Sequence, residues 1–260
     1  MIFDGRAFAK EIERIVKERV EAMSNKPKIL SILVGQDPAS ELYTRLKKQA
    51  AERVGIEFEE VRLESHREIE KVIGSSDADG IMIQMPIPGL SREEMQDLVK
   101  LIPLEKDVDG LRWEESGVMP ATVRAILSII DKIAQSQIIN SPILKSVRYV
   151  VVGSHGSVGK PLVHFLRKGG VGQITEVNSD TVEMKERILE GEVVISCTGR
   201  AGLITQEMVR PGVIAIDVGS PRGELTQGVY QKASVATPVP WGVGPVTVSC
   251  LMENAINLVL

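Results

Sequence analysis

Short apolar runs, too brief to be helices, constrain the fold of this chain most strongly. Ile29–Val34 and Tyr149–Val152 consist almost entirely of apolar residues, as strands buried on both faces of a sheet do. Patterns with helical periodicity separate these runs. Such alternation predicts an α/β fold built on parallel sheets. Four further runs predict strands, at Gly80–Gln84, Ile174–Val177, Val193–Ser196 and Val213–Val218.

Helical spacing of apolar residues marks the intervening segments. A second helix is predicted after Pro38, with Leu42, Leu46, Ala50 and Val54 on its buried side. Ser91–Glu94 has the sequence of a capping box, which predicts another helix start. Further helices are predicted along the stripe Phe8, Ile12, Ile15, Val16, Val20 and Met23, from Ala121 to Ile133, and from about Val158.

Composition excludes several classes of protein. The 260 residues suffice for two domains, and a net charge of −4 gives no reason to expect nucleic acid or an anionic membrane as partner. No apolar run approaches the ~20 residues that span a bilayer, and the N-terminus carries charge too early for a secretory signal. Cys197 and Cys250 lie among apolar residues and are predicted to be buried, reduced thiols rather than a disulfide or metal site. These features predict a cytoplasmic protein without a metal.

A glycine turn follows the strand that ends at Val152. Gly153, Gly156 and Gly159 form a G-x-x-G-x-x-G pattern at the start of the helix predicted from about Val158. Backbone N–H groups in this context can hold a pyrophosphate. The P-loop pattern does not fit, because Pro161 stands where Ser or Thr would bind magnesium. A dinucleotide site is favoured, and a bare glycine turn is the alternative.

Thr237–Thr247 contains three prolines and two glycines, so the sequence predicts neither helix nor regular strand there. A helical stripe follows, made of Val248, Leu251, Met252, Ala255 and Val259. The stretch is therefore predicted to be a rigid loop at a helix start, where free N–H groups can face a ligand. A proline-stiffened connector is the alternative.

Three polar residues in the first half of the chain lie at positions where a ligand-binding or catalytic site is expected. Tyr43 and Lys47 are four residues apart and share one helix face, and Gln84 ends an apolar strand where a ligand crevice is expected. A neutral amide can orient a lysine and leave its proton mobile. Taken singly, Lys47 also fits a solvated face with Arg45 and Lys48.

Four segments, in order along the chain, resemble the bifunctional methylenetetrahydrofolate dehydrogenase/cyclohydrolase (FolD) family. Val34–Lys47 is similar to the family's L-V-G-x-x-P-A-S-x-x-Y-x-x-x-K, and Ile83–Pro88 to V-Q-L-P-L-P. Lys106–Gly110 matches K-D-V-D-G, and Thr237–Thr247 resembles the C-terminal signature loop. The resemblance implies a folate-binding catalytic domain from residues 1–118 and 246–260 and a Rossmann-like NAD(P)-binding domain from 119–245. It also implies that the C-terminal helix returns to the first domain, and that the protein is a homodimer.

The resemblance also implies the roles of individual residues. Tyr43 packs on the folate rings, Lys47 is catalytic, Gln84 positions it, and Asp109 accepts hydrogen bonds from the amino-pyrimidine end of the pterin. Pro240, Gly244 and Pro245 complete the substrate site. The cofactor-binding residues implied are Gly153, Ser154, His155, Gly156, Ser157, Val158, Gly159, Ser179, Asp180, Thr198 and Gly199.

Some positions depart from the family pattern. Ser154 stands where an Arg contacts the 2′-phosphate of NADP, and Asp180 lies in a run that is often basic. NADP is the family's cofactor, but these changes make NAD an alternative, because an acidic residue here can bind the ribose diol. Trp241 replaces a glycine, and its indole is expected to stack on a ring or to narrow the site. Leu46 replaces a small polar residue, and Pro120–Ala125 departs from P-C-T-P-x-G.

The implied activities are oxidation of 5,10-methylenetetrahydrofolate and hydrolysis of the methenyl product to 10-formyltetrahydrofolate. Three alternatives stay open at this point. One is a monofunctional NAD-dependent methylenetetrahydrofolate dehydrogenase, and another is a non-catalytic dinucleotide-binding regulator. The third, an amino-acid or shikimate-type dehydrogenase, is disfavoured by the set Lys47, Gln84 and Asp109.

Overall fold

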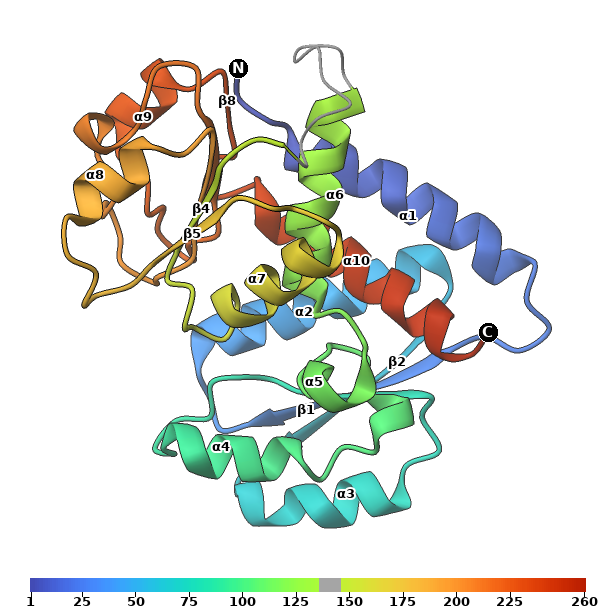
Figure 1. Ribbon diagram of the computed structural model, residues 1–260. Helices are drawn as coiled ribbons and strands as arrows, with labels where there is room; N and C mark the ends of the chain where they lie inside the picture. The colour runs from blue at the N-terminus through green and yellow to red at the C-terminus, as the bar shows by residue number, and fades with distance from the viewer. Residues whose placement is uncertain (136–145) are drawn as a thin grey trace. The chain divides into compact units, whose positions relative to one another are not determined.

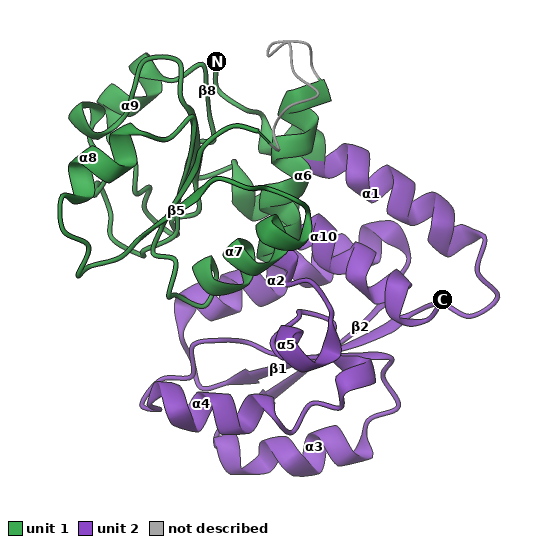
Figure 2. Ribbon diagram, in the orientation of Figure 1, with its two compact units in different colours: residues 1–8, 122–247 green, residues 9–121, 248–260 purple. Residues whose placement is uncertain are grey.

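The computed structural model describes residues 1–135 and 146–260, which form two compact α/β units. Unit 1 contains residues 1–8 and 122–247, and unit 2 contains residues 9–121 and 248–260 (Figure 2). The sequence placed residues 1–8 with the folate domain, whereas their contacts here are those of unit 1.

The sheet of unit 2 has three parallel strands in the order β2-β1-β3. These are β1 (Lys28–Val34), β2 (Glu57–Leu63) and β3 (Gly80–Ile83). Ile29 of β1 is paired with Phe58 of β2 and with Gly80 of β3. Because β1 lies between the other two strands, the chain changes direction across the sheet between β1 and β3. Such a switch point, outside the carboxyl ends of β1 and β3, is where α/β proteins bind ligands.

Helices cover both faces of this sheet (Figure 1). Leu30 and Ile32 point to a core shared with α3 (Ile69–Ser75) and α4 (Arg92–Val99). Ile29 points to the opposite core, as the alternation of side chains along a strand requires. The capping box predicted at the start of α4 is present: Ser91 and Glu94 exchange both hydrogen bonds. The remaining helical elements are α1 (Gly5–Glu21), α2 (Pro38–Val54), α5 (Trp113–Ser116), α10 (Val243–Leu258), η1 (His66–Glu68) and η2 (Leu104–Lys106).

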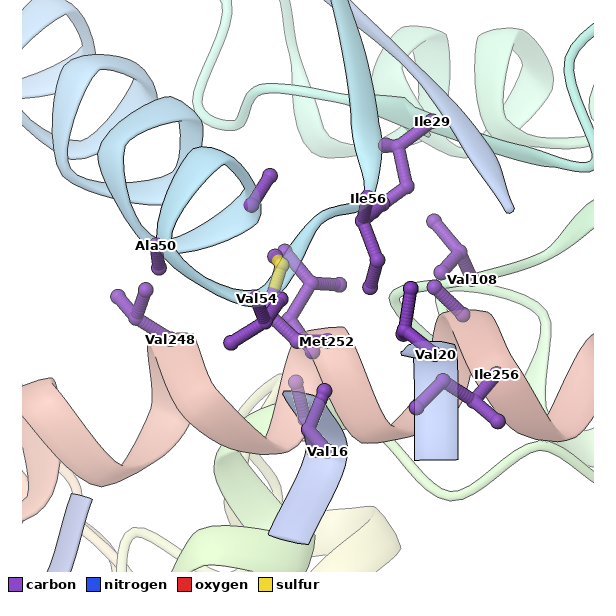
Figure 3. Packing of buried hydrophobic residues seen from close by; sticks show 14 of the residues in the cluster. Val16, Val20, Ile29, Ala50, Val54, Ile56, Val108, Val248, Met252 and Ile256 are labelled. Atoms are coloured by element: carbon purple, nitrogen blue, oxygen red, sulfur yellow. The ribbon is translucent and has the colours of Figure 1, made fainter. Parts of the chain in front are cut away.

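The second core joins the C-terminal helix to the rest of unit 2. Val16 and Val20 of α1, Val54 of α2 and Met252 of α10 point toward one another (Figure 3). All four are almost fully buried. Burying side chains of this size contributes about 1.5–3 kcal/mol each. The prediction that the C-terminal helix returns to the first domain is thereby confirmed.

The sheet of unit 1 has five parallel strands in the order β5-β4-β6-β7-β8. Val150 and Val152 of β4 pack with Ile188 of α8 and Val229 of α9 in one apolar cluster. Figure 1 shows α8 and α9 on one face of this sheet and α6 and α7 on the other. The strands are β4 (Tyr149–Val152), β5 (Ile174–Val177), β6 (Val193–Ser196), β7 (Ile214–Asp217) and β8 (Val235–Ala236). The helical elements are α6 (Ala121–Gln135), α7 (Gly159–Lys168), α8 (Met184–Leu189), α9 (Gln227–Lys232) and η3 (Gln206–Met208).

The first residues of the chain extend the unit 1 sheet beyond β8. Ile2 forms a parallel bridge with Ala236, and the Phe3 N–H donates to the Ala236 carbonyl at 2.9 Å. The ammonium group of Met1 donates to the Ser234 carbonyl at 2.6 Å. These bonds cover an edge strand that would otherwise expose unpaired backbone groups.

Two predictions about helix faces and bounds are wrong. Leu42 and Leu46 are 43% and 40% exposed, because the buried face of α2 passes through Thr44 and Lys47 instead. Helix α10 begins at Val243 and so includes part of the segment predicted as loop. Pro245 is tolerated there, since N–H groups in the first helical turn have no intrahelical partner. Val259 lies beyond the end of α10 and is partly exposed.

Candidate functional sites

Gln84 directly follows β3, at the point where the strand order switches between β1 and β3. Its backbone N–H donates to the Ile32 carbonyl at 2.8 Å, so the main chain is fixed there by the sheet. Its amide nitrogen donates to the Met85 carbonyl at 3.3 Å. This bond leaves the amide oxygen directed toward α2. The apolar strand thus ends in a hydrogen-bond acceptor of defined orientation.

Lys47 extends from α2 to this acceptor. Its Nζ lies 3.1 Å from Oε1 of Gln84, 3.5 Å from Oδ2 of Asp109 and 3.9 Å from the sulfur of Met82. The residue is only 6% exposed, so its cation is largely removed from water. A buried ammonium group needs such partners to offset the loss of hydration. Lys47 therefore belongs to a built polar cluster rather than to a solvated helix face.

Asp109 follows a segment that two buried side chains hold in place. Asp107 is fully buried and accepts hydrogen bonds from the N–H groups of Leu111 at 2.8 Å and Arg112 at 2.9 Å. Burial raises the pKa of the Asp107 carboxyl above its usual value. Asn254 of α10 donates to the Val108 carbonyl at 3.0 Å, directly before Asp109. The C-terminal helix thereby fixes the backbone that presents Asp109 to Lys47.

The cluster differs in one respect from the arrangement expected from the sequence. A neutral amide alone was expected to orient the lysine, whereas the carboxylate of Asp109 also approaches it. Tyr43 lies one turn before Lys47 on α2 and is half-buried. The structure therefore brings Lys47, Gln84 and Asp109 together, with Tyr43 on the adjoining helix turn.

In unit 1, the glycine turn and the loop after β6 meet where the strand order reverses. Gly153 follows β4 with φ +90°, and a Cβ on it would lie 2.7 Å from the Cys197 carbonyl oxygen. A Cβ on Gly159 would lie 2.1 Å from the Gly153 carbonyl oxygen. Only glycine fits at these two positions. This tight turn leads directly into the start of α7, the kind of position at which dinucleotide-binding folds hold a pyrophosphate.

Ser154 is turned into the protein. It is 1% exposed, and its hydroxyl accepts a hydrogen bond from the side-chain amide of Asn178 at 2.8 Å. The carbonyl of the same amide accepts from the His155 N–H at 3.0 Å. Asn178 was not among the predicted site residues, although its position at the end of β5 was a signal that could have identified it. It ties the glycine turn to the next strand end.

The other predicted cofactor residues differ in exposure. His155, Ser157, Ser179 and Asp180 are exposed around the turn, while Gly156 and Val158 are half-buried. The N–H groups of Thr198 and Gly199 donate to the buried carboxylate of Glu224, at 2.9 Å and 2.7 Å. These two N–H groups already have a hydrogen-bond acceptor within the protein. Sequence reasoning missed Glu224, because nothing in its neighbourhood marks it as more than a surface acid.

Trp241 keeps a backbone conformation typical of glycine. Its φ is +81°, and its side chain is 52% exposed. The guanidinium carbon of Arg6 lies 3.8 Å from the ring centroid, so this cation covers one face of the indole. Pro240 is exposed, whereas Gly244 and Pro245 are half-buried in the first turn of α10. These three residues belong to unit 1, so their predicted role at the folate site remains a prediction.

One of the two thiols lies beside the glycine turn: the Cys197 thiol donates to the Val152 carbonyl at 3.2 Å. Cys197 and Cys250 are free, and Cys250 is fully buried. Burial raises the pKa of the Cys197 thiol to about 12, which keeps it protonated.

Within residues 1–135 and 146–260, no helix is long and apolar enough to cross a membrane.

Comparison with known proteins identifies the family of this chain. The family model "Tetrahydrofolate dehydrogenase/cyclohydrolase, catalytic domain" matches residues 3–109, and the corresponding "NAD(P)-binding domain" matches residues 120–260. A "Bifunctional protein FolD" from an Exiguobacterium species is 35% identical and covers 99% of this chain and 98% of that protein. Another, from Methanoculleus marisnigri, is 32% identical over 99% of this chain and 95% of that protein.

Solved structures give the same result. The bifunctional FolD enzyme of Campylobacter jejuni superposes with a TM-score of 0.86 at 26% identity, covering 99% of this chain and 98% of that one. The Trypanosoma brucei FolD, solved with NADP and an inhibitor, has a TM-score of 0.86 at 27% identity, with 99% and 96% covered. The predicted α/β fold with a Rossmann-like unit is confirmed, and this chain belongs to the tetrahydrofolate dehydrogenase/cyclohydrolase family.

Proposed function

We propose that this chain carries both activities of its family, that hydrolysis depends on the polar cluster of unit 2, and that oxidation needs in addition the glycine turn of unit 1. It oxidises 5,10-methylenetetrahydrofolate with a nicotinamide dinucleotide, and it hydrolyses the methenyl product to 10-formyltetrahydrofolate. Lys47 is the proton-transfer group of the second step. The observation that carries this assignment is the contact of Nζ with Gln84 at 3.1 Å and with Asp109 at 3.5 Å, in a site with little solvent.

The hydrolytic step requires three proton movements. Water adds to the methenyl carbon and loses one proton. The hydroxyl group so formed then loses its proton as the bond from this carbon to N5 breaks and N5 gains a proton, which leaves the formyl C=O on N10. Lys47 can serve such transfers if an acceptor keeps its nitrogen directed at the substrate, and Gln84 is that acceptor. The amide of Gln84 is itself held by the Met85 carbonyl, so the lysine is oriented before substrate binds.

Asp109 connects substrate binding to the state of Lys47. In this proposal its carboxylate accepts hydrogen bonds from the amino-pyrimidine end of the pterin, and Tyr43 packs on the rings. The carboxylate also attracts the ammonium group across 3.5 Å in the described structure. Hydrogen bonds from the pterin compete for the same negative charge. Substrate binding therefore loosens the Asp109–Lys47 pair and leaves Gln84 as the main partner of the lysine.

The dehydrogenase step needs alignment of two rings more than an acid or a base. NAD(P), when bound, accepts a hydride from the methylene carbon of the substrate. Gly153, Gly156 and Gly159 hold its pyrophosphate in this proposal, since side chains at the first and last of these positions would collide with the backbone. Thr198 and Gly199 border the site from the end of β6.

We further propose that the cofactor site accepts NAD beside the NADP typical of the family. Ser154 supplies no cation, because a serine hydroxyl is neutral, and its side chain is in addition buried against Asn178. Asp180 is exposed just beyond β5, where an acidic side chain can accept hydrogen bonds from the ribose diol and would repel a 2′-phosphate. Pairing of two copies through the nucleotide units and a cytoplasmic location complete the proposal, on the strength of the family resemblance.

The test is a pair of optical traces on the purified protein. In the first, 5,10-methylenetetrahydrofolate is supplied with NADP or with NAD and the reduced nicotinamide is followed. In the second, methenyltetrahydrofolate is supplied alone and its hydrolysis is followed. We expect turnover in both traces, with NAD active in the first. Reduction without methenyl hydrolysis would favour a monofunctional dehydrogenase, and folate binding without either reaction would favour a non-catalytic regulator.

A further inference from the structure

Glu224 is a buried acid whose carboxylate is surrounded by donors from the end of β6. The residue is 1% exposed. Its Oε2 accepts from the N–H of Thr198 at 2.9 Å, from the Thr198 hydroxyl at 2.7 Å and from the Ser196 hydroxyl. Its Oε1 accepts from the Gly199 N–H at 2.7 Å. These four donors satisfy the buried carboxylate with charge-assisted hydrogen bonds, which are stronger than bonds between neutral groups.

The backbone of Glu224 is fixed as firmly as its side chain. Asp217, at the end of β7, accepts from the N–H groups of Gly219 at 2.9 Å, Glu224 at 3.0 Å and Leu225 at 3.0 Å. The Glu224 carbonyl accepts from the Ile204 N–H at 2.9 Å. Burial raises the pKa of the Asp217 carboxyl, an effect that its three backbone donors oppose. The carboxylate of Glu224 is therefore anchored to β7 and cannot follow a movement of the loop that it holds.

The held loop lies directly against the glycine turn. The Cys197 carbonyl oxygen is so close to Gly153 that a Cβ on this glycine would lie 2.7 Å from it. Any displacement of Thr198 and Gly199 thus changes the space in which the turn receives a pyrophosphate. The side-chain hydrogen bonds of Glu224 run to Ser196, Thr198 and Gly199, that is, to the end of β6 and the loop after it.

We infer that Glu224 is a positioning residue of the nicotinamide dinucleotide site: its carboxylate holds the Thr198–Gly199 loop against the glycine turn and thereby sets the affinity for the dinucleotide. This inference rests on the proposed function, which places the cofactor at the glycine turn. The role requires a carboxylate. An amide of the same size has one acceptor oxygen, and its NH₂ would face the N–H of Thr198 or of Gly199.

The test is the Glu224→Gln variant of the full chain, assayed for both reactions and titrated with NADP and NAD. We expect the dissociation constant and the KM of the dinucleotide to rise at least tenfold. The rate of methenyl hydrolysis should stay unchanged, because Lys47 lies in the other unit and this step needs no dinucleotide. The matched control is Glu186→Gln, which changes an exposed acid of unit 1 and should alter neither reaction.

Two results would overturn the inference. One is an unchanged dinucleotide affinity in Glu224→Gln, and the other is a parallel loss of both activities, which would indicate a purely structural role. If this variant does not fold, Ser196→Ala removes a single donor and should raise the KM of the dinucleotide about threefold, and an unchanged KM would overturn the inference.

Gly159→Ala separates this inference from the proposed function. Its Cβ blocks the turn itself, so dinucleotide binding should be lost. If Gly159→Ala loses dinucleotide binding and Glu224→Gln keeps it, the role of Glu224 is refuted and the proposed location of the cofactor site still stands. Full binding in both variants would refute the location of the cofactor site.

Discussion

Replacing Asn254 by Asp tests how the C-terminal helix supports the folate site. Asn254 is 2% exposed, and its NH₂ group donates to the carbonyls of Val108 and Met119, each at 3.0 Å. Asn254→Asp keeps the size but replaces this double donor by a carboxyl group. When protonated, the carboxyl can donate only once, so one buried carbonyl loses its partner at a cost of about 1–3 kcal/mol.

The cost should grow with pH. Burial among carbonyl groups raises the folded-state pKa of the introduced carboxyl above its unfolded value of about 3.9. Below pH ~4 the group is protonated in both states, so the pH-dependent part of the cost is absent. As pH rises, the unfolded state releases the proton and the folded state retains it, so stability falls by about 1.4 kcal/mol per pH unit. With a folded-state pKa above 7, which full burial without a cationic partner predicts, the variant should lose about 2.7 kcal/mol between pH 5 and pH 7 beyond any change in the wild type.

Urea unfolding at these two pH values measures the effect. The matched control is Asn257→Asp on the same helix, where the side chain is exposed and accepts a hydrogen bond from Arg19 at 2.9 Å. A carboxylate beside this arginine should leave stability unchanged or slightly higher. In the absence of denaturant, Asn254→Asp should raise the KM for the folate substrate, because the Val108 carbonyl directly precedes Asp109. A pH-dependent loss below about 0.5 kcal/mol would refute the account of Asn254 as a buried double donor.

Three further predictions concern the cofactor, the Asp109 segment and the thiols. Asp180→Ala should lower kcat/KM with NAD about tenfold and leave or improve that with NADP, and equal losses with both would refute a contact with the ribose. Gly110→Ala should destabilise the protein by several kcal/mol more than Gly89→Ala: both glycines have positive φ, but only a Cβ on Gly110 would meet backbone, 2.6 Å from the Pro120 nitrogen. A disulfide reagent at pH 8 should react with neither Cys197 nor Cys250 in the native protein, and with both thiols after unfolding. Burial holds the pKa of Cys197 at about 12, so a fast native reaction would contradict its described environment.

The sequence predicts the strands that are buried on both faces, because their continuous apolar runs have no other explanation. Runs at β1, β4 and β6 are confirmed almost residue for residue. Strand β2 was missed, since most of its side chains are exposed or half-buried and its sequence, Glu57–Leu63, alternates without a clear apolar face. β8 was missed because it has only two residues and relies on Ile2 to cover its edge.

The identity of a helix face is harder to predict than the helix itself. Leu42 and Leu46 define an apolar stripe on α2, yet the buried face holds Thr44 and Lys47. Hydrophobicity alone favours burying the leucines, whereas in this structure Gln84 and Asp109 stabilise the buried lysine. Gln84 and Asp109 lie 37 and 62 residues beyond Lys47 in the sequence, so nothing local to the helix indicates their presence.

Partners distant in sequence also explain what was missed around the cofactor site. The sequence places Ser154 where the resemblance implies an arginine, but the burial of Ser154 against Asn178 depends on the end of a neighbouring strand. Glu224 follows an ordinary Arg-Gly pair, and only the parallel order of β6 and β7 brings it to Thr198 and Gly199. Trp241 is a comparable case, because the cation over its ring comes from Arg6 at the other end of the chain.

The most direct test of the central claim is the Lys47→Met variant, measured in both reactions. Methionine keeps an unbranched apolar chain in the buried site and removes only the charged nitrogen that contacts Gln84 and Asp109. The account predicts that methenyl hydrolysis falls by at least 100-fold, the size of a proton-transfer contribution, while the dissociation constant of the dinucleotide stays unchanged. Hydrolysis at the wild-type rate in this variant would contradict the assignment of Lys47 and with it the proposed mechanism.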